Sequence, residues 1–298
     1  MRFLILSKGR AVHATGRLVD EAAALGHTAR VVDPDGCCVV SGPGGGVFSV
    51  TGHPVAVSGD VVVPRNGSGA RDEGVAVVEA LERGGVPSLT PSAALRLARD
   101  KLRCLRTADA AGIRIPRTAL IRSPAQLDVA LEAIGGLPAV VKLRFGSQGV
   151  GVMLARDRDA ADSIVQTLCS LAQGVLLQEI VGPAPGGSDL RIVVVAGTAV
   201  ASMERHAARD TFRANVHRGG RVRAGTPGRE VEAMACEAAA TLGLGLAGVD
   251  LVLDDDGPSL LEVNGSPGFE GVERVTGVNV ARAAIAAAAR LGSPTGGC

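Results

Sequence analysis

Two acidic residues on neighbouring strands of a predicted hairpin could hold a metal ion. Asp250 and Glu262 each lie in a short apolar run, and residues 254–258 separate the two runs. If those residues form the turn, Leu253 pairs with Ser259. Counting back along both strands then places Asp250 directly opposite Glu262. Such side chains have Cβ atoms roughly 4.5 to 5.5 Å apart, where like charges repel. The pattern therefore predicts a positive charge between the two carboxylates.

A third oxygen ligand, Asn264, is expected on the same face of this hairpin. It lies two residues beyond Glu262, and every second side chain of a strand points to the same face. Ligation by oxygen alone suits a hard divalent cation, and Mg²⁺ takes few protein ligands while leaving room for phosphates. The alternative is an ordinary pair of surface acids at a hairpin edge.

A glycine-rich segment is predicted to be the loop of a second hairpin, because it lies between two short apolar runs. It reads Gly146-Ser147-Gln148-Gly149-Val150-Gly151. Walker A needs Gly-Lys-Ser/Thr before a helix, and the dinucleotide fingerprint has the order G-x-G-x-x-G, so the segment is neither. Backbone N–H groups of such a flexible loop can still close over an anion. A plain hairpin turn is the alternative.

Basic residues near these two hairpins could bind phosphate. Lys142 ends the apolar strand 138–142, and an ammonium group in such surroundings needs an anionic partner. Lys101 is a second candidate, although a lysine in a charged stretch is often solvated. Arginine forks match carboxylate and phosphate bidentately, and three arginines precede the acidic hairpin: Arg205, Arg213 and Arg218. A solvated basic loop is an equally good interpretation of these arginines. Together the groups indicate nucleotide-dependent chemistry on an anionic substrate.

The composition argues against several other functions. The 298 residues carry a net charge of +1, which gives no electrostatic basis for binding nucleic acid or an anionic membrane. With no Trp, no Tyr and five Phe, the chain has almost no stacking platforms for single-stranded nucleic acid. The first apolar run is too short for a signal peptide, and no uncharged apolar stretch is long enough to span a membrane. We therefore expect a cytoplasmic protein whose six cysteines are free thiols.

The elements that must position these residues begin with an α/β domain over residues 1–94. Strands and helices alternate in the predicted pattern, which indicates a small parallel sheet. The glycines of 42–46 are expected to break two short strands of a hairpin-like insertion. The strands are predicted near 3–6, 29–32 and 60–65, and the helices near 15–25 and 75–81.

A second, larger domain is predicted over residues 95–298. A helix from Leu95 to Leu102 is expected to open it, with Lys101 in its last turn. The further strands are predicted near 118–121, 139–143, 150–154, 175–180, 190–195 and 199–203. The further helices are predicted near 230–242 and 281–291.

The order of these residues resembles that of the ATP-grasp superfamily, and within it the RimK-type glutamate ligases, which add glutamate to the C-terminus of a small-subunit ribosomal protein. The resemblance covers nearly the whole chain and is most specific in 98–103, 215–220 and 247–277. It implies an α/β (α+β) fold in which a pre-ATP-grasp domain over 1–94 precedes the ATP-grasp domain. The nucleotide would lie between a small subdomain over 95–178 and a large one over 179–298, under the glycine loop.

The resemblance also implies roles for individual residues. The residues that would hold phosphates are Lys101, Lys142, Gly146, Ser147, Gln148 and Gly149. Those that would meet the adenine or another part of ATP are Gln178, Glu179, Ile180, Asp189, Arg213, Ala214 and Asn215. A pair of Mg²⁺ or Mn²⁺ ions would be held by Asp250, Glu262 and Asn264, which agrees with the hairpin argument. The catalytic residues, which would neutralise charge on the transferred phosphoryl group, would be Arg205, Arg213 and Arg218.

The implied reaction converts a carboxylate to an acyl phosphate with ATP, and an amine then displaces the phosphate to form an amide. The expected donor is L-glutamate and the expected acceptor is the C-terminus of a peptide or protein, acted on by a homo-oligomer that is a dimer or a tetramer. Two alternatives stay open. One is the same chemistry on a carrier protein of lysine or arginine biosynthesis or on a peptide natural product, and the other is a non-catalytic ATP-binding regulator. Ile180 departs from the family, which has an aromatic residue there.

Overall fold

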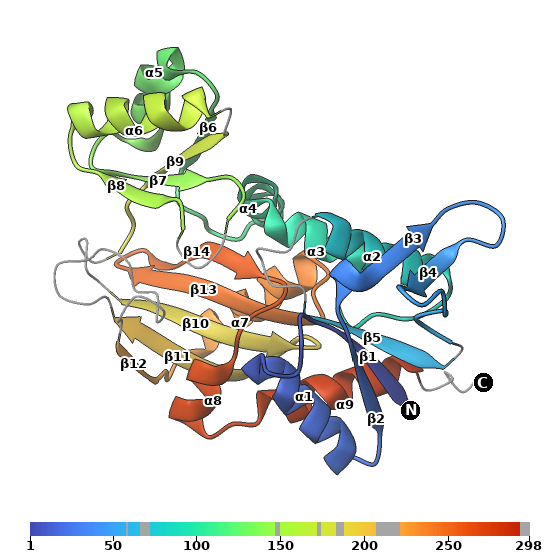
Figure 1. The fold of residues 1–298 in the computed structure, drawn as a ribbon. Coiled ribbons are helices and arrows are strands. Elements are labelled where there is room, and N and C mark those ends of the chain that lie inside the picture. Colours follow the sequence, from blue (N-terminus) through green and yellow to red (C-terminus); the bar gives the residue numbers. More distant parts are fainter. Residues whose placement is uncertain are drawn as a thin grey trace.

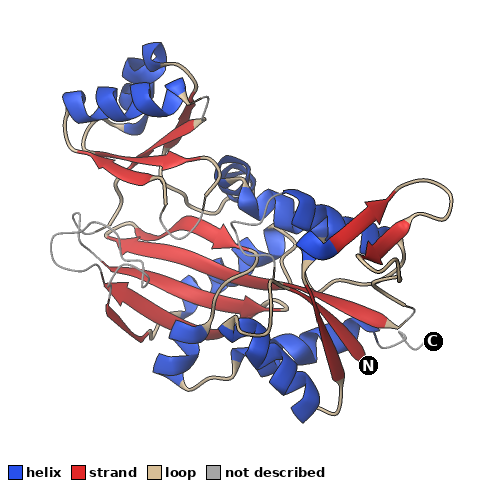
Figure 2. Cartoon of the chain, in the orientation of Figure 1, coloured by secondary structure: helices blue, strands red, loops and turns tan. Residues whose placement is uncertain are grey.

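The computed structural model describes residues 1–57, 59–65, 72–146, 150–171, 174–182, 188–206 and 221–292. In these ranges the strands form four sheets, and helices pack against them (Figures 1 and 2). The predicted α/β class is confirmed. Among the described helices, none combines the length and the apolar character needed to cross a membrane.

A three-stranded parallel sheet with the order β2-β1-β5 opens the chain. Its central strand, β1 (Arg2–Leu6), pairs with β2 (Thr28–Val32) on one side and with β5 (Asp60–Pro64) on the other. Strand alternation sends Phe3 and Ile5 into a core with helices α1 (His13–Ala24) and α9 (Val280–Gly292). Leu4 and Leu6 enter a second core with α2 (Asp72–Arg83). Both faces are thus covered, as parallel sheets require.

Two short strands, β3 (Cys37–Val40) and β4 (Gly46–Ser49), form an antiparallel hairpin beside this sheet, after a short 3-10 helix at Pro34–Gly36. The predicted hairpin-like insertion is confirmed. The five cysteines in the described part of the chain are free thiols, as expected.

The single helix predicted from Leu95 to Leu102 is wrong. Two helices, α3 (Ser92–Arg99) and α4 (Lys101–Ala110), meet at Asp100, whose backbone is extended. The Asp100 carboxylate accepts a hydrogen bond from the backbone N–H of Arg103, at 3.2 Å, and so caps α4. Lys101 is therefore the first residue of a helix, directly after the cap.

A four-stranded antiparallel sheet with the order β6-β9-β7-β8 forms a separate lobe at the top of Figure 1. Its strands are β6 (Thr118–Ile121), β7 (Ala139–Leu143), β8 (Val152–Ala155) and β9 (Val175–Glu179). Its own core includes residues of α5 (Leu127–Ile134) and α6 (Arg158–Ser170), two helices that the sequence analysis did not predict. A 3-10 turn at Pro124–Gln126 precedes α5.

The largest sheet is antiparallel and has the order β12-β11-β10-β13-β14. Its strands are β10 (Ser188–Val195), β11 (Thr198–His206), β12 (Arg221–Ala224), β13 (Leu246–Asp254) and β14 (Gly257–Asn264). Helix α7 (Arg229–Thr241) covers one face. Part of the other face packs on α8 (Glu270–Thr276) and α9, in the same core as α1. The last helix therefore joins the first sheet to the largest one.

Candidate active site

Asp250 and Glu262 face each other across β13 and β14, as the sequence predicts. The predicted turn, however, is wrong. The strands pair as far as Asp254 opposite Gly257, so the loop has two residues rather than five, and Leu253 pairs with Pro258. A bulge between Asp250 and Leu251 then shifts the register by one residue. The two differences cancel, and the bulge is what places Glu262 on the face of Asp250.

Asp250 is neutralised by arginine side chains from two neighbouring strands. Arg191 donates to both of its carboxylate oxygens, from Nε at 2.7 Å and from Nη2 at 2.6 Å. Arg205 Nη2 lies 2.9 Å from Oδ2 of Asp250. Burial alone would raise the pKa of the Asp250 carboxyl, but Arg191 and Arg205 hold its pKa below its usual value. The predicted positive charge beside Asp250 is thus supplied by protein.

Arg205 binds a second carboxylate in the same network. Its Nε and Nη2 donate to the two oxygens of Asp189 at 2.6 and 2.7 Å. Asp189 lies opposite Arg205, and Arg191 lies opposite Asp250, in the strand pairings of the sheet. Arg205 belongs to β11 and is only 3% exposed, so the alternative of a solvated basic loop does not hold for this arginine. Sequence reasoning missed Arg191, whose spacing of two from Asp189 was the available signal.

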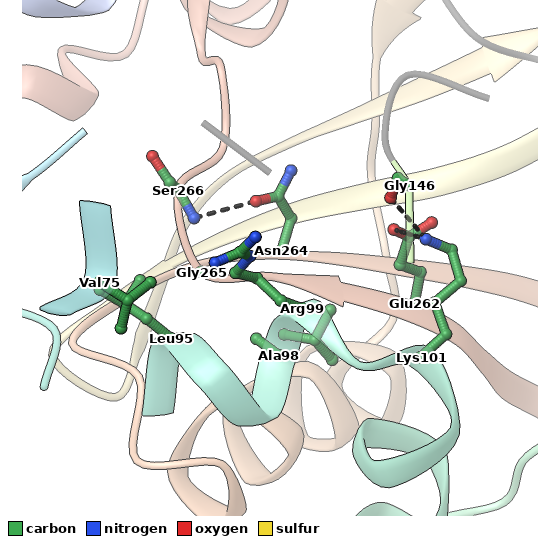
Figure 3. A pocket seen from close by; sticks show the side chains of 11 residues that line it. Val75, Leu95, Ala98, Arg99, Lys101, Gly146, Glu262, Asn264, Gly265 and Ser266 are labelled. Atoms are coloured by element: carbon green, nitrogen blue, oxygen red, sulfur yellow. Dashed lines mark hydrogen bonds and ion pairs between the residues drawn. The ribbon is translucent and has the colours of Figure 1, made fainter. Parts of the chain in front are cut away.

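Glu262 is neutralised by Lys101, from the start of α4. Lys101 Nζ lies 3.3 Å from Oε1 of Glu262 and donates to the carbonyl oxygen of Gly146 at 2.7 Å. Asp100, the preceding cap residue, accepts hydrogen bonds from Nε and Nη2 of Arg144 at 2.9 and 2.5 Å. Figure 3 shows Lys101, Gly146 and Glu262 gathered at one end of a pocket. The cap, the start of the glycine loop and the acidic hairpin thus converge on one ammonium group.

Lys142 approaches the same region from β7. Its Nζ donates to Oε1 of Gln178 at 2.5 Å, and Nε2 of Gln178 donates to the Thr118 hydroxyl at 2.9 Å. Burial lowers the pKa of Lys142 to about 8, although the negative charge of Glu262 opposes the shift. The amide of Gln178 is thereby turned toward the lysine inside the sheet. An anion that reached Lys142 would raise its pKa again and so favour the ammonium form.

Glu179 and Ile180 follow Gln178 on the chain segment that leaves β9. The carboxylate of Glu179 accepts from the backbone N–H of Arg117 at 2.7 Å and from its Nε at 2.6 Å. Ile180 is half-buried. The carboxylate of Glu179 is therefore engaged, while its contribution and that of Ile180 to an adenine site stay predictions.

Several predicted site residues lie outside the described residues: Ser147, Gln148, Gly149, Arg213, Ala214, Asn215 and Arg218.

A pocket extends from Glu262 along the chain to Ser266, with α3, the start of α4 and Val75 as its other walls (Figure 3). Asn264 lies on the face of Glu262, opposite Gly248, and its Oδ1 accepts from the backbone N–H of Ser266 at 2.9 Å. Gly265 is closely packed, since an added Cβ would lie 3.0 Å from Leu244 and 3.2 Å from Leu95. The acidic strand thus ends tightly against α3.

The donors along this strand fit a hard divalent cation that brings phosphate oxygens with it. Glu262 is 37% exposed at its side chain and offers carboxylate oxygens, and Asn264 offers an amide oxygen. Asp250 would have to share its oxygens with Arg191 and Arg205. In the described part of the chain no group of at least three His, Cys, Asp or Glu side chains could hold a metal alone.

Comparison with known proteins gives consistent matches over the whole chain. Residues 1–95 match the RimK PreATP-grasp domain, and residues 98–288 match the RimK-like ATP-grasp domain. A protein of Shewanella amazonensis named "Probable alpha-L-glutamate ligase 1" is 39% identical over 96% of this chain and 94% of its own.

Two solved structures share the fold. A RimK domain protein from Sphaerobacter thermophilus has a TM-score of 0.76 and 26% identity, over 96% of this chain and 98% of its own. The ATP-grasp ligase PsnB, solved with a phosphomimetic variant of a minimal precursor, Mg and ADP, has a TM-score of 0.74 and 20% identity, over 98% of both chains.

Proposed function

The chain belongs to the RimK-like ATP-grasp family and is an ATP-dependent carboxylate–amine ligase, and from this premise we propose that it adds L-glutamate to the C-terminus of a peptide or protein. A ribosomal protein is the first acceptor to test. The proposal is supported by the names of the similar proteins and by the peptide-bound state of PsnB. The observation that carries it is the convergence of Lys101, Lys142 and Glu262 from three elements on one region.

Two steps account for the products. An oxygen of the acceptor carboxylate attacks the terminal phosphorus of ATP, and the bond from that phosphorus to ADP breaks. The nitrogen of glutamate then attacks the acyl carbon, the bond from carbon to the phosphate oxygen breaks, and the nitrogen loses its proton as the amide forms. Lys101 and Lys142 would hold the phosphates of ATP. Their positive charges would then stabilise the negative charge that develops during phosphoryl transfer. No protein nucleophile is needed.

A bound divalent cation would supply further neutralisation of the phosphate charge. Glu262 and Asn264 would hold it, with Asp250 as a third ligand that keeps its arginines. We propose Mg²⁺, with Mn²⁺ as a substitute, and a pair of ions in the complete site. Arg213 and Arg218 would complete the positive field around the reacting groups, and Arg205, proposed as the third arginine, would act by positioning Asp189 and Asp250.

The test is ligation by the purified chain with ATP, Mg²⁺, glutamate and candidate acceptor peptides, followed by mass spectrometry. Each acceptor should gain whole glutamyl residues while ADP is released. A profile of all twenty amino acids as donors, and of Mn²⁺ in place of Mg²⁺, identifies the preferred substrates. Binding of ATP without any mass increment, and without oligoglutamate, would reject the ligase proposal in favour of a regulator.

Glu262→Ala should abolish ADP release, because the residue holds both the metal and Lys101 in place. Glu132→Ala, at an exposed position of α5, is the matched control and should keep full activity. Retained activity in Glu262→Ala would reject the metal role. A cytoplasmic location and assembly into a dimer or tetramer are part of the proposal, and light scattering tests the assembly.

A further inference from the structure

Arg65 lies where the first sheet meets the acidic strand. It follows β5, and its backbone N–H donates to the carbonyl oxygen of Leu6 at 2.8 Å. Strand β1 is followed in the chain by β2, which pairs with one edge of β1, whereas β5 pairs with the other edge of β1. The carboxyl ends of β1 and β5 therefore form the point where strand order reverses, which is where open α/β sheets bind ligands.

The side chain of Arg65 is half-buried, and its guanidinium is only partly satisfied. Nη2 donates to the carbonyl oxygen of Pro267 at 2.7 Å, and the group lies over the ring of Phe269 at 5.4 Å. Nε and Nη1 are buried and have no hydrogen-bond partner in the part of the chain that the structure describes. Burial lowers the pKa of Arg65 to about 10, so the group is still charged at neutral pH. A buried charge without a counterion is costly.

Other arginines of the site are compensated fully. Arg144, Arg191 and Arg205 each donate from Nε and Nη2 to both oxygens of a carboxylate. No such carboxylate pairs with Arg65 among the described residues. Packing on Phe269 explains the position of the Arg65 side chain, but it provides no hydrogen-bond acceptor for Nε and Nη1. Buried polar groups of this kind usually have a hydrogen-bond partner.

A second unsatisfied group lies next to the residue that binds Arg65. Among the described residues four buried side-chain atoms lack a partner, and three of them are Nε and Nη1 of Arg65 and Oγ of Ser266. Ser266 is 7% exposed and lines the pocket. It precedes Pro267, so the hydroxyl and the guanidinium are held by one short segment. Figure 3 shows Ser266 away from the end occupied by Lys101 and Glu262.

We propose that Arg65 and Ser266 bind a carboxylate group of the amino-acid substrate. This carboxylate takes no part in bond formation. Glutamate reacts through its amine, so its α-carboxylate and its γ-carboxylate are both of this kind. Ser266 lies four positions after Glu262, and an extended chain spans at most about 14 Å over that length, enough for a phosphoryl group, the reacting carbon and one amino acid. The inference rests on the proposed function and assigns the recognition of the donor.

Steady-state kinetics of the full chain test the subsite. Arg65→Gln should raise the KM for glutamate about 10- to 100-fold, as expected for the loss of charge-assisted hydrogen bonds, and should leave the KM for ATP within about twofold. Arg65→Lys keeps the charge without the fork and should fall between Arg65→Gln and the wild type. Arg83→Gln, on an exposed residue of α2, is the matched control and should behave as wild type.

Amide analogues show which carboxylate is bound. Glutamine lacks the γ-carboxylate, and the α-amide of glutamate lacks the α-carboxylate. For the wild-type chain, one of these two analogues should have a much higher KM than glutamate. That same analogue should carry no further penalty in Arg65→Gln. An unchanged KM for glutamate in the variant, or an analogue penalty of equal size in both chains, overturns the proposal.

Two further measurements keep the outcomes distinct. If Arg65→Gln does not fold, Ser266→Ala replaces it and should raise the KM for glutamate several-fold, whereas an unchanged KM rejects the subsite. If the wild type ligates no amino acid, the proposed function fails by itself. Labelled glutamate is then titrated into wild type and Arg65→Gln with a non-hydrolysable ATP analogue and Mg²⁺, and equal binding overturns the subsite.

Discussion

At the scale of single residues, the charges of the site are balanced in two different ways. Asp250 pairs with Arg191 and with Arg205, which also binds Asp189, whereas Glu262 has one lysine and a partly exposed side chain. The sequence predicts the two facing acids because strand alternation depends on local spacing alone. It cannot predict Arg191 and Arg205 as partners, because those contacts depend on the register of three strands. Of these two acids, Glu262 is the one whose carboxylate is partly exposed and could bind a cation.

Nucleotide affinity should depend on the protonation of Lys142. Its pKa of about 8 in the free protein must rise when anionic phosphates bind, so binding takes up a proton above pH 8 and none below. The dissociation constant for ATP should therefore be flat below pH 8 and increase above it, by up to about tenfold per pH unit. Titration calorimetry from pH 6.5 to 9.5 measures this. Lys142→Arg stays charged and should remove the dependence, and an unchanged profile would contradict the assignment.

Arg205→Met should destabilise the protein far more than the loss of a surface ion pair. It leaves Asp189 without its bidentate partner inside the sheet, which we expect to cost about 3 to 5 kcal/mol. Arg158→Met removes pairs to Asp128 and Asp162 at the surface and should cost about 0 to 1 kcal/mol. Urea unfolding compares the two variants. Equal effects would show that the buried network adds little to stability.

At the scale of elements, the hairpin shows how a correct pairing can come from an incorrect turn. The tight loop at Asp255 and Asp256 and the bulge near Leu261 each shift the register, in opposite directions. Neither has a signal in the apolar pattern, since both depend on local backbone geometry. The boundary at Asp100 was missed for a similar reason, because the cap interrupts a continuous helical pattern.

Gly248, at the element scale, is a position beside the site where a substitution should be costly. It lies opposite Asn264, and an added Cβ would lie 2.7 Å from Cβ of Pro267, a rigid ring. Gly248→Ala should therefore displace the segment that holds Asn264 and Ser266, cost about 1 to 3 kcal/mol and lower kcat/KM. Gly36→Ala has open space at its Cβ and serves as the control. Unfolding and ligation assays check both, and a variant with wild-type stability and activity would contradict the close packing.

At the scale of the whole molecule, the sequence predicts the order of the α/β regions along the chain. Only the structure shows that the first sheet and the largest sheet share one hydrophobic core. The boundary at residue 94 stays a prediction. Helix α9 packs in one core with α1, with β1 and with strands of the largest sheet. The lobe built from β6 to β9 has a core of its own. Contacts between the two ends of a chain carry no local pattern, so no periodicity reveals them.

A chain that ends at Gly277 should lose order in the first sheet and keep it in the separate lobe. Without α9, residues such as Phe3 and Ile5 lose one covering layer. Hydrogen exchange read by mass spectrometry should show fast exchange in β1 and β5, with slow exchange persisting in β7 and β9. Full protection of β1 in the shortened chain would refute the shared core.

The position of α9 has a consequence for synthesis in the cell. The amino end of the chain leaves the ribosome first, yet its sheet obtains its second covering helix only when residues 280–292 have emerged. Until those residues have emerged, one face of β1 and β5 stays without that partner and is open to aggregation. A nascent chain of this protein should therefore depend on chaperones from the first strands until α9 is available.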